Sequence, residues 1–295
     1  MSFLKPRDPN KPDDRFFRAK ITDRVDFAAE LWMVRVRTDG EFSFIPGQFV
    51  SLGLEIDGKR IERPYSIASA PSENDVEFFL ELVPQGALTP HLYKLQVGDE
   101  LLMRKIAKGK FSLDRIGGKK NHLLISTVTG VAPFVSYVRT LAKEWKEGKF
   151  DESQKLYLLN GASQPLEFGY REELVQFERE LPWFKYVPTV SRPWDHADWW
   201  GEIGRAEDVL RKYADQWELE PSNTVAYLCG HPEMVKNSKA ILKRRGFIEK
   251  GAVKEEVYWI PPHKQPLVGI ASLPPRRSIG ALRDSSARRC APGPE

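Results

Sequence analysis

Cysteine is nearly absent from this chain of 295 residues, and long apolar runs are missing altogether. The two cysteines, Cys229 and Cys290, are too few for a disulfide scaffold, and an iron–sulfur cluster needs four thiolates. No run approaches the roughly 20 apolar residues of a membrane helix. The N-terminal residues also lack the apolar segment of a secretory signal. We therefore expect a cytoplasmic protein without a metal site.

An excess of one charge is also missing from most of the chain. The formal net charge is +4, but six of the 45 basic residues and only two of the 41 acidic ones lie in residues 260–295. The remaining 39 basic and 39 acidic residues balance, so nucleic-acid binding is not expected. With 41% hydrophobic residues and this length, the chain is expected to form two globular domains.

Short strand patterns fill the first part of the chain. Asp57-Gly58 is a hairpin signal between two of them. Short strands separated by Gly and Pro turns predict an antiparallel β-barrel over residues 15–117, after a flexible lead-in over residues 1–14. Apolar residues indicate strands over 31–37, 42–45, 49–52 and 76–83.

Apolar strands alternate with amphipathic helices in the second part. This alternation predicts a parallel sheet with helices on its faces, an α/β domain over residues 118–259. Residues 260–295 are basic, rich in proline and without periodicity, so a disordered tail is expected there. Strands are predicted over 122–126, 155–159, 186–190, 225–229 and 253–259, and helices over 133–146, 171–180 and 232–245.

Two stretches of the first domain could bind a nucleotide. In Arg63-Pro64-Tyr65-Ser66, the Arg could bind a phosphate while the Tyr stacks on a planar ring. In the stretch from Gly86 to Leu92, a Gly turn opens a short helix with Thr89 as the predicted N-cap, and a helix N-terminus can bind an anion. Taken singly, each stretch also fits an ordinary edge strand or a well-capped helix.

Two loops of the second domain each follow a buried strand and open a helix. The first runs from Thr127 to Pro133 and contains Gly130; the second is Cys229-Gly230-His231-Pro232. Ligands of doubly wound sheets bind at the carboxyl ends of the strands, where both loops are expected to lie. Cys229 also fits a small residue packed in the core.

These four stretches, in this order and over residues 15–259, resemble the ferredoxin–NADP reductase family, and its bacterial flavodoxin/ferredoxin type most. The resemblance implies FAD on the barrel, NADP on the α/β domain, and hydride transfer between them. By position it assigns to FAD the residues Arg63, Pro64, Tyr65, Ser66, Gly86 and Thr89. To NADP it assigns Thr129, Gly130, Ala132, Pro133, Cys229 and Gly230, with Ser191, Arg192 and Arg205 for the 2′-phosphate.

The segment Glu256-Val257-Tyr258-Trp259 is similar to the end of this family's fold. The resemblance implies that Tyr258 covers the flavin face, that Trp259 adds an aromatic contact to FAD, and that Glu256 belongs to a proton path. The expected catalytic residues are therefore Ser66, Cys229, Glu256 and Tyr258. Tyr258 and Trp259 also fit simple caps of the last strand.

Two residues depart from the family pattern. Ser163 stands where relatives often carry a further arginine, so discrimination of NADP from NAD is expected to be weaker. Val128 stands where glycine is usual, and a β-branched residue disfavours positive φ, so a less open phosphate loop is expected. The chain also continues for 36 residues beyond Trp259, where related bacterial chains stop or nearly stop.

The resemblance implies a ferredoxin or flavodoxin as the electron-transfer partner of a monomeric enzyme. A basic run of Arg104, Lys105, Lys108 and Lys110 is a candidate docking site for such a partner, or a solvated strand edge. Two alternatives stay open. The first is a reductase component of an oxygenase or a general NAD(P)H–flavin reductase; the second is a flavin-binding or nucleotide-binding sensor module with little turnover, which Val128 and Ser163 would favour.

Overall fold

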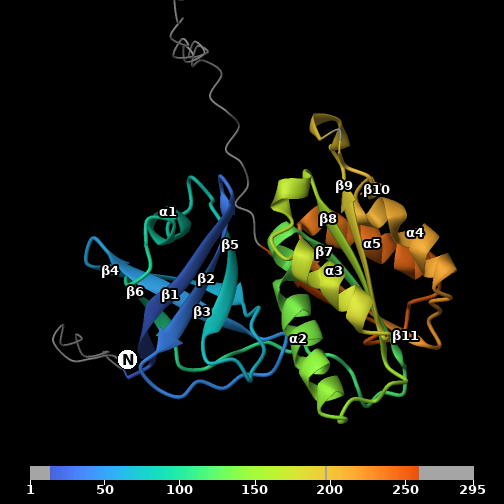
Figure 1. The fold of residues 1–295 in the computed structure, drawn as a ribbon, viewed down its shortest axis with the longest axis horizontal. Helices are drawn as coiled ribbons and strands as arrows, with labels where there is room; N and C mark the ends of the chain where they lie inside the picture. Colours follow the sequence, from blue (N-terminus) through green and yellow to red (C-terminus); the bar gives the residue numbers. More distant parts are fainter. Residues whose placement is uncertain (1–13, 197, 259–295) are drawn as a thin grey trace, which may run out of the picture. The chain divides into compact units, whose positions relative to one another are not determined.

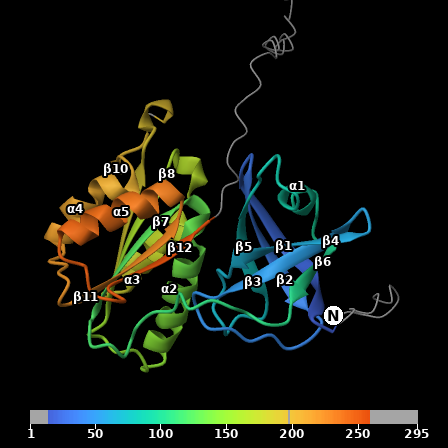
Figure 2. The same ribbon diagram turned by 180° about the vertical axis from the view of Figure 1, so that it is seen from behind.

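The chain folds into two six-stranded sheets, one antiparallel and one parallel (Figures 1 and 2). The structure is a computed structural model, and it describes residues 14–196 and 198–258. The described residues belong to one compact unit. The predicted fold class, an antiparallel β domain followed by an α/β domain, is confirmed.

The first sheet is built from amphipathic strands in the order β4-β3-β6-β1-β2-β5. All neighbours pair antiparallel, and the edge strands β4 and β5 also contact each other. Alternate side chains point inward, so Trp32, Leu52 and Phe78 are fully buried in one core. The strands are β1 (Phe16–Ala28), β2 (Leu31–Thr38), β3 (Phe49–Ile56), β4 (Lys59–Ser66), β5 (Val76–Glu81) and β6 (Glu100–Arg104).

The hairpin prediction at Asp57-Gly58 is confirmed: both residues have positive φ, at 50° and 70°, between β3 and β4. The strand predicted over Phe42–Ile45 is wrong. The backbone N–H of Ile45 donates to the side chain of Gln48 at 2.9 Å instead of joining a ladder. Apolar residues occur at positions 42 and 44 for another reason: the two rings stack, with centroids 5.7 Å apart, and pack against the core of the sheet.

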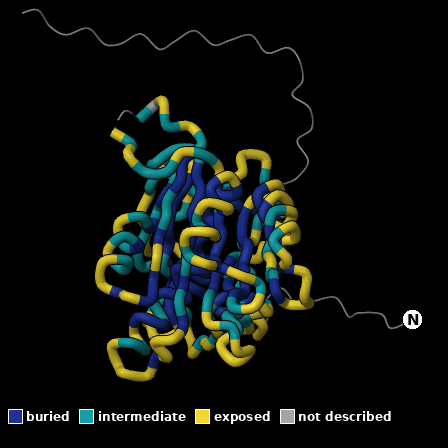
Figure 3. The backbone as a smooth tube through the Cα atoms, turned by 90° about the vertical axis from the view of Figure 1, so that its right-hand side faces the viewer, coloured by how far each residue is buried: buried dark blue, intermediate teal, exposed yellow. Residues whose placement is uncertain are grey.

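The second sheet is parallel throughout, in the order β10-β9-β8-β7-β11-β12. Its central strands are apolar on both faces because helices cover both sides, as Figure 1 shows and as the buried tube segments of Figure 3 indicate. The strands are β7 (Asn121–Thr127), β8 (Lys155–Ala162), β9 (Phe184–Val190), β10 (Glu202–Ile203), β11 (Thr224–Gly230) and β12 (Val253–Val257). The helices are α2 (Ala132–Lys146), α3 (Arg171–Glu180), α4 (Ala206–Gln216) and α5 (Pro232–Arg244).

Three local predictions differ from the structure. The short helix α1 (Thr89–Leu92) has Leu88 as its N-cap, so the prediction of Thr89 as the cap is wrong. The hydroxyl of Thr89 instead exchanges hydrogen bonds with the backbone of Val83, at 3.0 and 3.1 Å. Helix α4 and strand β10 were not predicted. The last strand ends at Val257, two residues before the predicted end.

Helix α2 touches both sheets. Its Ser136 hydroxyl donates to the carbonyl of Ser69 at 2.7 Å, and its Tyr137 hydroxyl donates to the carbonyl of Phe111. Both acceptors belong to the chain of the antiparallel domain, between β4 and β7. These hydrogen bonds fix α2 against the antiparallel domain, although the helix covers the parallel sheet.

The predicted lead-in and tail fall almost entirely outside the described residues, as does Trp259. Among the helices that the structure describes, none has the length and apolar character needed to cross a membrane.

Candidate functional site

The two loops at the carboxyl ends of β7 and β11 touch each other closely. A Cβ on Gly130 would lie 2.3 Å from the carbonyl oxygen of Cys229. Gly230 has a φ of +132°, and a Cβ there would lie 2.3 Å from the hydroxyl of Thr127. That hydroxyl accepts a hydrogen bond from the backbone N–H of His231 at 2.8 Å. Only glycine fits at positions 130 and 230, so both loops depend on these residues.

Sequence reasoning missed Thr127 as the residue that joins these loops. It is the last residue of β7, and its side chain reaches across to the loop after β11. The strands pair with Ile125 opposite Leu228 and Ser126 opposite Cys229, which places the two loops side by side. The available signal was its place as the first residue of the predicted loop, Thr127 to Pro133.

Tyr258 joins the two domains at this edge of the sheet. Its hydroxyl lies 3.3 Å from Ser66 Oγ, at the end of β4, and 3.3 Å from the carbonyl oxygen of Thr129. Its backbone N–H donates to the carbonyl of Gly230 at 3.2 Å. Three stretches that are far apart in the sequence, around residues 66, 129 and 230, therefore meet at one tyrosine.

Glu256 lies beside the same serine. Its Oε2 atom accepts a hydrogen bond from Ser66 Oγ at 3.5 Å. Register places Glu256 opposite Cys229 in the parallel pair β11–β12. Burial raises the pKa of Glu256 to about 7, while the Ser66 hydrogen bond opposes that rise. A carboxyl with such a pKa can take up and release a proton near neutral pH.

Cys229 is fully buried at the end of β11. Burial raises the pKa of its thiol, and the nearby charge of Glu256 raises it further. Burial likewise raises the pKa of Tyr258 well above its usual value. Both groups therefore stay protonated at neutral pH, so Cys229 has the properties of a packing or contact residue rather than of a thiolate nucleophile.

The other predicted residues of β4 lie on its accessible side. Arg63 and Pro64 are exposed, and the Arg63 guanidinium donates to the carbonyl of Glu62 at 2.7 Å. Among the described residues Arg63 has no carboxylate partner. Tyr65 is half-buried and packs on the core of the sheet. The hydrogen bonds and contacts found for Gly86 and Thr89 join them to Val83 rather than to Arg63.

Ser191 and Arg192, predicted for the 2′-phosphate, directly follow β9, and Arg205 lies between β10 and α4. The backbone N–H of Ser191 donates to Ala162 at 3.0 Å, and that of Arg192 donates to Ser163 at 2.9 Å. The Arg192 side chain is exposed. Arg205, directly before α4, is 59% exposed and lies 3.8 Å from Glu233 and 4.0 Å from Glu207. Both separations are long for ion pairs and the Arg205 side chain is exposed, so its charge is largely available to an anion although Glu207 itself is buried.

Val128 adopts the conformation that its side chain disfavours. Its φ is +43°, at a cost of about 1–2 kcal/mol. The side chain packs on the cluster of Ala162, Phe168 and Val190, and on the cluster beside α2. This packing holds Val128 in a left-handed conformation at the first position of the loop Val128–Val131. The predicted effect on nucleotide affinity stays a prediction.

Comparison with known proteins matches each domain separately. Residues 18–112 match the oxidoreductase FAD-binding domain, and residues 124–240 match the oxidoreductase NAD-binding domain. A ferredoxin–NADP reductase of Pseudomonas aeruginosa is 33% identical over 217 residues, covering 69% of this chain and 80% of the relative. A flavodoxin/ferredoxin–NADP reductase of Escherichia coli is 31% identical over 203 residues, covering 66% of this chain and 77% of the relative.

The chain belongs to the ferredoxin–NADP reductase family. A crystal structure of such a reductase from Neisseria gonorrhoeae, with bound FAD and NADP, superimposes with a TM-score of 0.73 at 25% identity. The match covers 83% of this chain and 99% of the other. The resemblance inferred from the four sequence stretches is therefore confirmed, and the chain is an oxidoreductase with an FAD-binding and an NAD-binding domain.

The chemistry of the site fits the two nucleotides of a ferredoxin–NADP reductase. Arg63, Arg192 and Arg205 present cationic side chains to solvent, as phosphate groups require. Tyr65, next to Ser66 in the chain, and Tyr258, hydrogen-bonded to Ser66, supply aromatic rings near this serine, which suits a planar flavin.

We predict that Gly130→Ala weakens NADPH binding at least tenfold while FAD stays bound. The added methyl group must push the loop Val128–Val131 away from Cys229, since its carbon would lie only 2.3 Å from the carbonyl oxygen of Cys229. The measurement is the Kd for NADPH by equilibrium titration of the FAD-loaded protein. Gly251→Ala, where nothing lies within 4 Å, is the control and should leave this Kd unchanged. Equal Kd values for Gly130→Ala and the unmodified protein would contradict the role of the close contact.

Proposed function

We propose that the protein is an FAD-dependent ferredoxin/flavodoxin–NADP reductase. It passes a hydride between NADPH and FAD and single electrons to a small ferredoxin or flavodoxin. One observation carries this proposal: Tyr258 joins Ser66 of the FAD-binding domain to Thr129 of the NAD-binding domain. The domain division near Gly117-Gly118, between the two matched regions, and the cytoplasmic location belong to the same proposal.

FAD supplies the redox chemistry when bound, accepting a hydride and releasing single electrons. In this proposal Arg63 holds its pyrophosphate, with Pro64 shaping the strand, and Tyr65 stacks on its ring. Ser66 places a hydroxyl at the ring's reactive edge. Gly86 and the turn around Thr89 form a second phosphate contact, with Thr89 fixing the turn through Val83.

The loops after β7 and β11 hold the nicotinamide nucleotide. Thr129, Gly130, Ala132 and Pro133 form the turn and the first residues of α2, where the positive end of the helix dipole would attract phosphate. In this proposal Cys229 and Gly230 contact the nicotinamide ring. Residues Ser191, Arg192 and Arg205 bind the 2′-phosphate, which favours NADP over NAD.

Tyr258 acts as a gate in this proposal. Hydride transfer needs the reacting atoms about 3–3.5 Å apart. Because Tyr258 lies between Ser66 and Thr129, its ring must move aside before the nicotinamide can reach the flavin. Two hydrogen bonds of its hydroxyl, both at 3.3 Å, hold it in the resting position.

Ser66 and Glu256 form the proton path of the proposal. Oxidation of NADPH by two one-electron acceptors releases one proton overall. Ser66 Oγ can pass that proton to Glu256 Oε2, 3.5 Å away. The pKa of Glu256, about 7 because of burial, suits a group that accepts and then releases a proton at neutral pH.

Three lysines of the predicted docking run support binding of an acidic partner. Lys105, Lys108 and Lys110 are exposed around Ile106, which is 71% exposed. Arg104 is less available because its guanidinium pairs with Glu62 at 2.7 and 3.0 Å. This basic loop approaches the proton path, since a Cβ on Gly109 would lie 3.6 Å from Glu256 Oε1. An acidic protein docked there would lie beside Glu256 and Ser66.

The choice among acceptors is tested by turnover. The purified protein with NADPH should reduce ferredoxin or flavodoxin faster than it reduces free flavin. Faster reduction of free flavin would favour a general flavin reductase. Failure to reduce any acceptor would favour a sensor module and contradict the proposal.

Replacing Tyr258 by Ser should tighten NADP⁺ binding about tenfold or more and change the flavin absorbance spectrum. The reason is that the nucleotide no longer has to displace a ring. Tyr258→Phe keeps the ring and loses both hydroxyl contacts, so it should bind NADP⁺ nearly as the unmodified protein does. Titration of the flavin spectrum with NADP⁺ measures both. A Kd for Tyr258→Ser that matches the original one would rule out the gate.

The rate of partner reduction should rise as pH increases through about 7, because the ionised form of Glu256 accepts the proton. Glu256→Gln should lower this rate by about 10²-fold and remove the inflection. Glu255→Gln is the matched control, because Glu255 is exposed and pairs with Lys239 at 2.8 Å. The rate of partner reduction is measured from about pH 5 to about pH 9, on both sides of the pKa of Glu256. An inflection near pH 7 that survives in Glu256→Gln would show that another group carries the proton.

Charge reversal of Lys105 and Lys108 to Glu should slow partner reduction at low salt about tenfold or more and flatten its salt dependence. The double variant Lys185→Glu/Lys243→Glu makes the same change of net charge at two exposed lysines of the other domain. Stopped-flow rates of partner reduction at several ionic strengths distinguish the effect of charges at the docking loop from the effect of the protein's net charge. If both double variants slow the reaction equally, the basic loop is not the docking site.

A further inference from the structure

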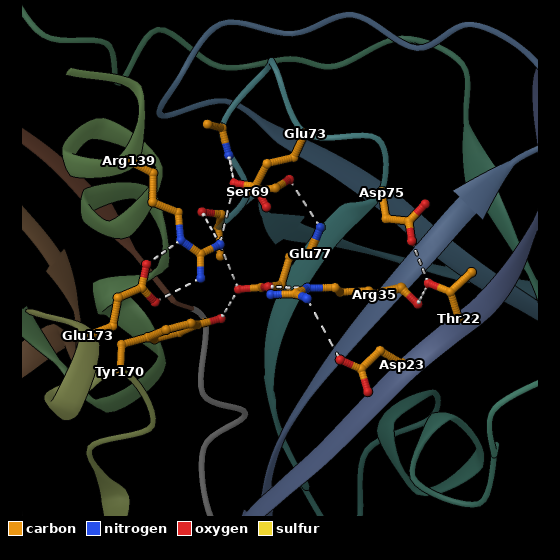
Figure 4. Close-up of polar contacts among 12 residues, drawn as sticks. Thr22, Asp23, Arg35, Ser69, Glu73, Asp75, Glu77, Arg139, Tyr170 and Glu173 are labelled. Atoms are coloured by element: carbon orange, nitrogen blue, oxygen red, sulfur yellow. Dashed lines mark hydrogen bonds and ion pairs between the residues drawn. The ribbon is translucent and has the colours of Figure 1, made fainter. Parts of the chain in front are cut away.

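A buried carboxylate of the FAD-binding domain lies at the centre of an ion network (Figure 4). Glu77 in β5 has no exposed surface. Its Oε2 accepts from Arg35 Nε of the same sheet at 2.7 Å. Its Oε1 accepts from the hydroxyl of Tyr170 at 2.8 Å and from Arg139 at 3.0 Å, both in the other domain. Glu77 is therefore shared between the two domains.

Arg139 completes the network from helix α2. Its guanidinium makes a bidentate pair with Glu173 of α3, at 2.7 and 2.8 Å. It also lies 3.5 Å from the carbonyl of Ala68 and 3.6 Å from Glu73. Its side chain is only 12% exposed. Arg139 thus holds one partner in its own domain and several in the other.

The segment that receives these contacts is the one that carries Ser66. Ser69, three residues later, accepts through its carbonyl from Ser136 at 2.7 Å and through its hydroxyl from the backbone N–H of Glu77 at 3.1 Å. With Ala68 bound to Arg139, α2 contacts two successive residues of the segment 66–69. Movement of α2 would therefore move Ser66.

The other end of α2 begins in the nucleotide loop. The helix starts at Ala132, directly after the loop Val128–Val131, and Arg139 lies two turns further on. The same rigid helix therefore carries the loop at its N-terminus and the contacts to the segment 66–69 on its side. The distance from Ser66 to Thr129, which Tyr258 spans, depends on how α2 is seated.

A planar guanidinium suits this task. The bidentate pair with Glu173 fixes the plane of the Arg139 guanidinium within its own domain and so directs Nη1 at Glu77 across the domain boundary. A hollow of about 500 Å³ opens beside the network, lined by Arg35, Glu73, Arg139 and Glu173 among others. This hollow is open to solvent, so the alignment beside it depends on the ion pairs and hydrogen bonds named above.

We propose that Arg139 and Glu77 are positioning residues that set the gap between the two cofactor sites, and thereby the rate of hydride transfer. This inference rests on the proposed function. Neither residue touches a reacting atom; both act through α2 and the segment 66–69. Removing the arginine should leave each nucleotide site intact and lengthen the distance between them.

The test uses the full-length, FAD-loaded protein and three variants. Arg139→Met removes the charge at similar length, and Arg139→Lys keeps the charge without the bidentate geometry. Arg37→Met is the matched control, since Arg37 pairs with Asp75 at 2.7 Å inside the first domain alone. Single-turnover flavin reduction by NADPH gives the hydride-transfer rate, and titration gives the Kd for NADP⁺. Hydrogen exchange of residues 66–70 and 132–140 reports the seating of α2 without turnover.

We expect Arg139→Met to lower the hydride-transfer rate at least tenfold, with FAD content and Kd changed less than twofold. Exchange should increase in both segments, Arg139→Lys should be intermediate, and Arg37→Met should match the original protein. An unchanged rate in folded Arg139→Met, or an equal loss in Arg37→Met, overturns the inference. If Arg139→Met does not fold, Arg139→Lys decides: a rate and exchange pattern like the original protein's also overturns it. Failure of the proposed function is distinct, because the original protein itself would then not be reduced by NADPH.

Discussion

The hydrogen-bonded contact of Tyr258 with Ser66 and Thr129 is the interaction on which the account of this protein depends. Ser66 belongs to the domain that matches FAD-binding domains, and Thr129 belongs to the domain that matches NAD-binding domains. A hydride crosses only a few ångströms, so neither half is sufficient alone. Helix α2 packs against the first domain and begins directly after the loop Val128–Val131, which in the proposed function belongs to the second site.

Burial around this contact explains the protonation of the residues there. Glu256 is a carboxyl in a poorly solvated place, so its pKa rises to about 7, and Cys229 and Tyr258 stay neutral for the same reason. The exposed guanidinium groups lie elsewhere, at Arg63 and after β9 and β10, and in the proposed function they bind phosphates. Proton transfer and anion binding would then use different residues.

The sequence predicted much of the fold because those features are local, while the roles of the site residues stay predictions. Residues that are adjacent in the sequence determine the alternation of the strands, the Asp57-Gly58 turn and the loops after β7 and β11. Phe42 and Phe44 alternate along the chain as residues of a strand do, but their rings stack on each other outside the sheet. The Thr89 hydroxyl bonds to the backbone of Val83 instead of capping the helix. The pair of Glu77 with Arg139 joins residues 62 positions apart, so only tertiary packing could reveal it.

The most direct test of the central claim is a stopped-flow mixture of the anaerobic FAD-loaded protein with NADPH, and in parallel with NADH. If the two nucleotide sites meet as described, the flavin absorbance is lost rapidly with NADPH and more slowly with NADH. A yellow protein whose absorbance both nucleotides leave unchanged would contradict the account.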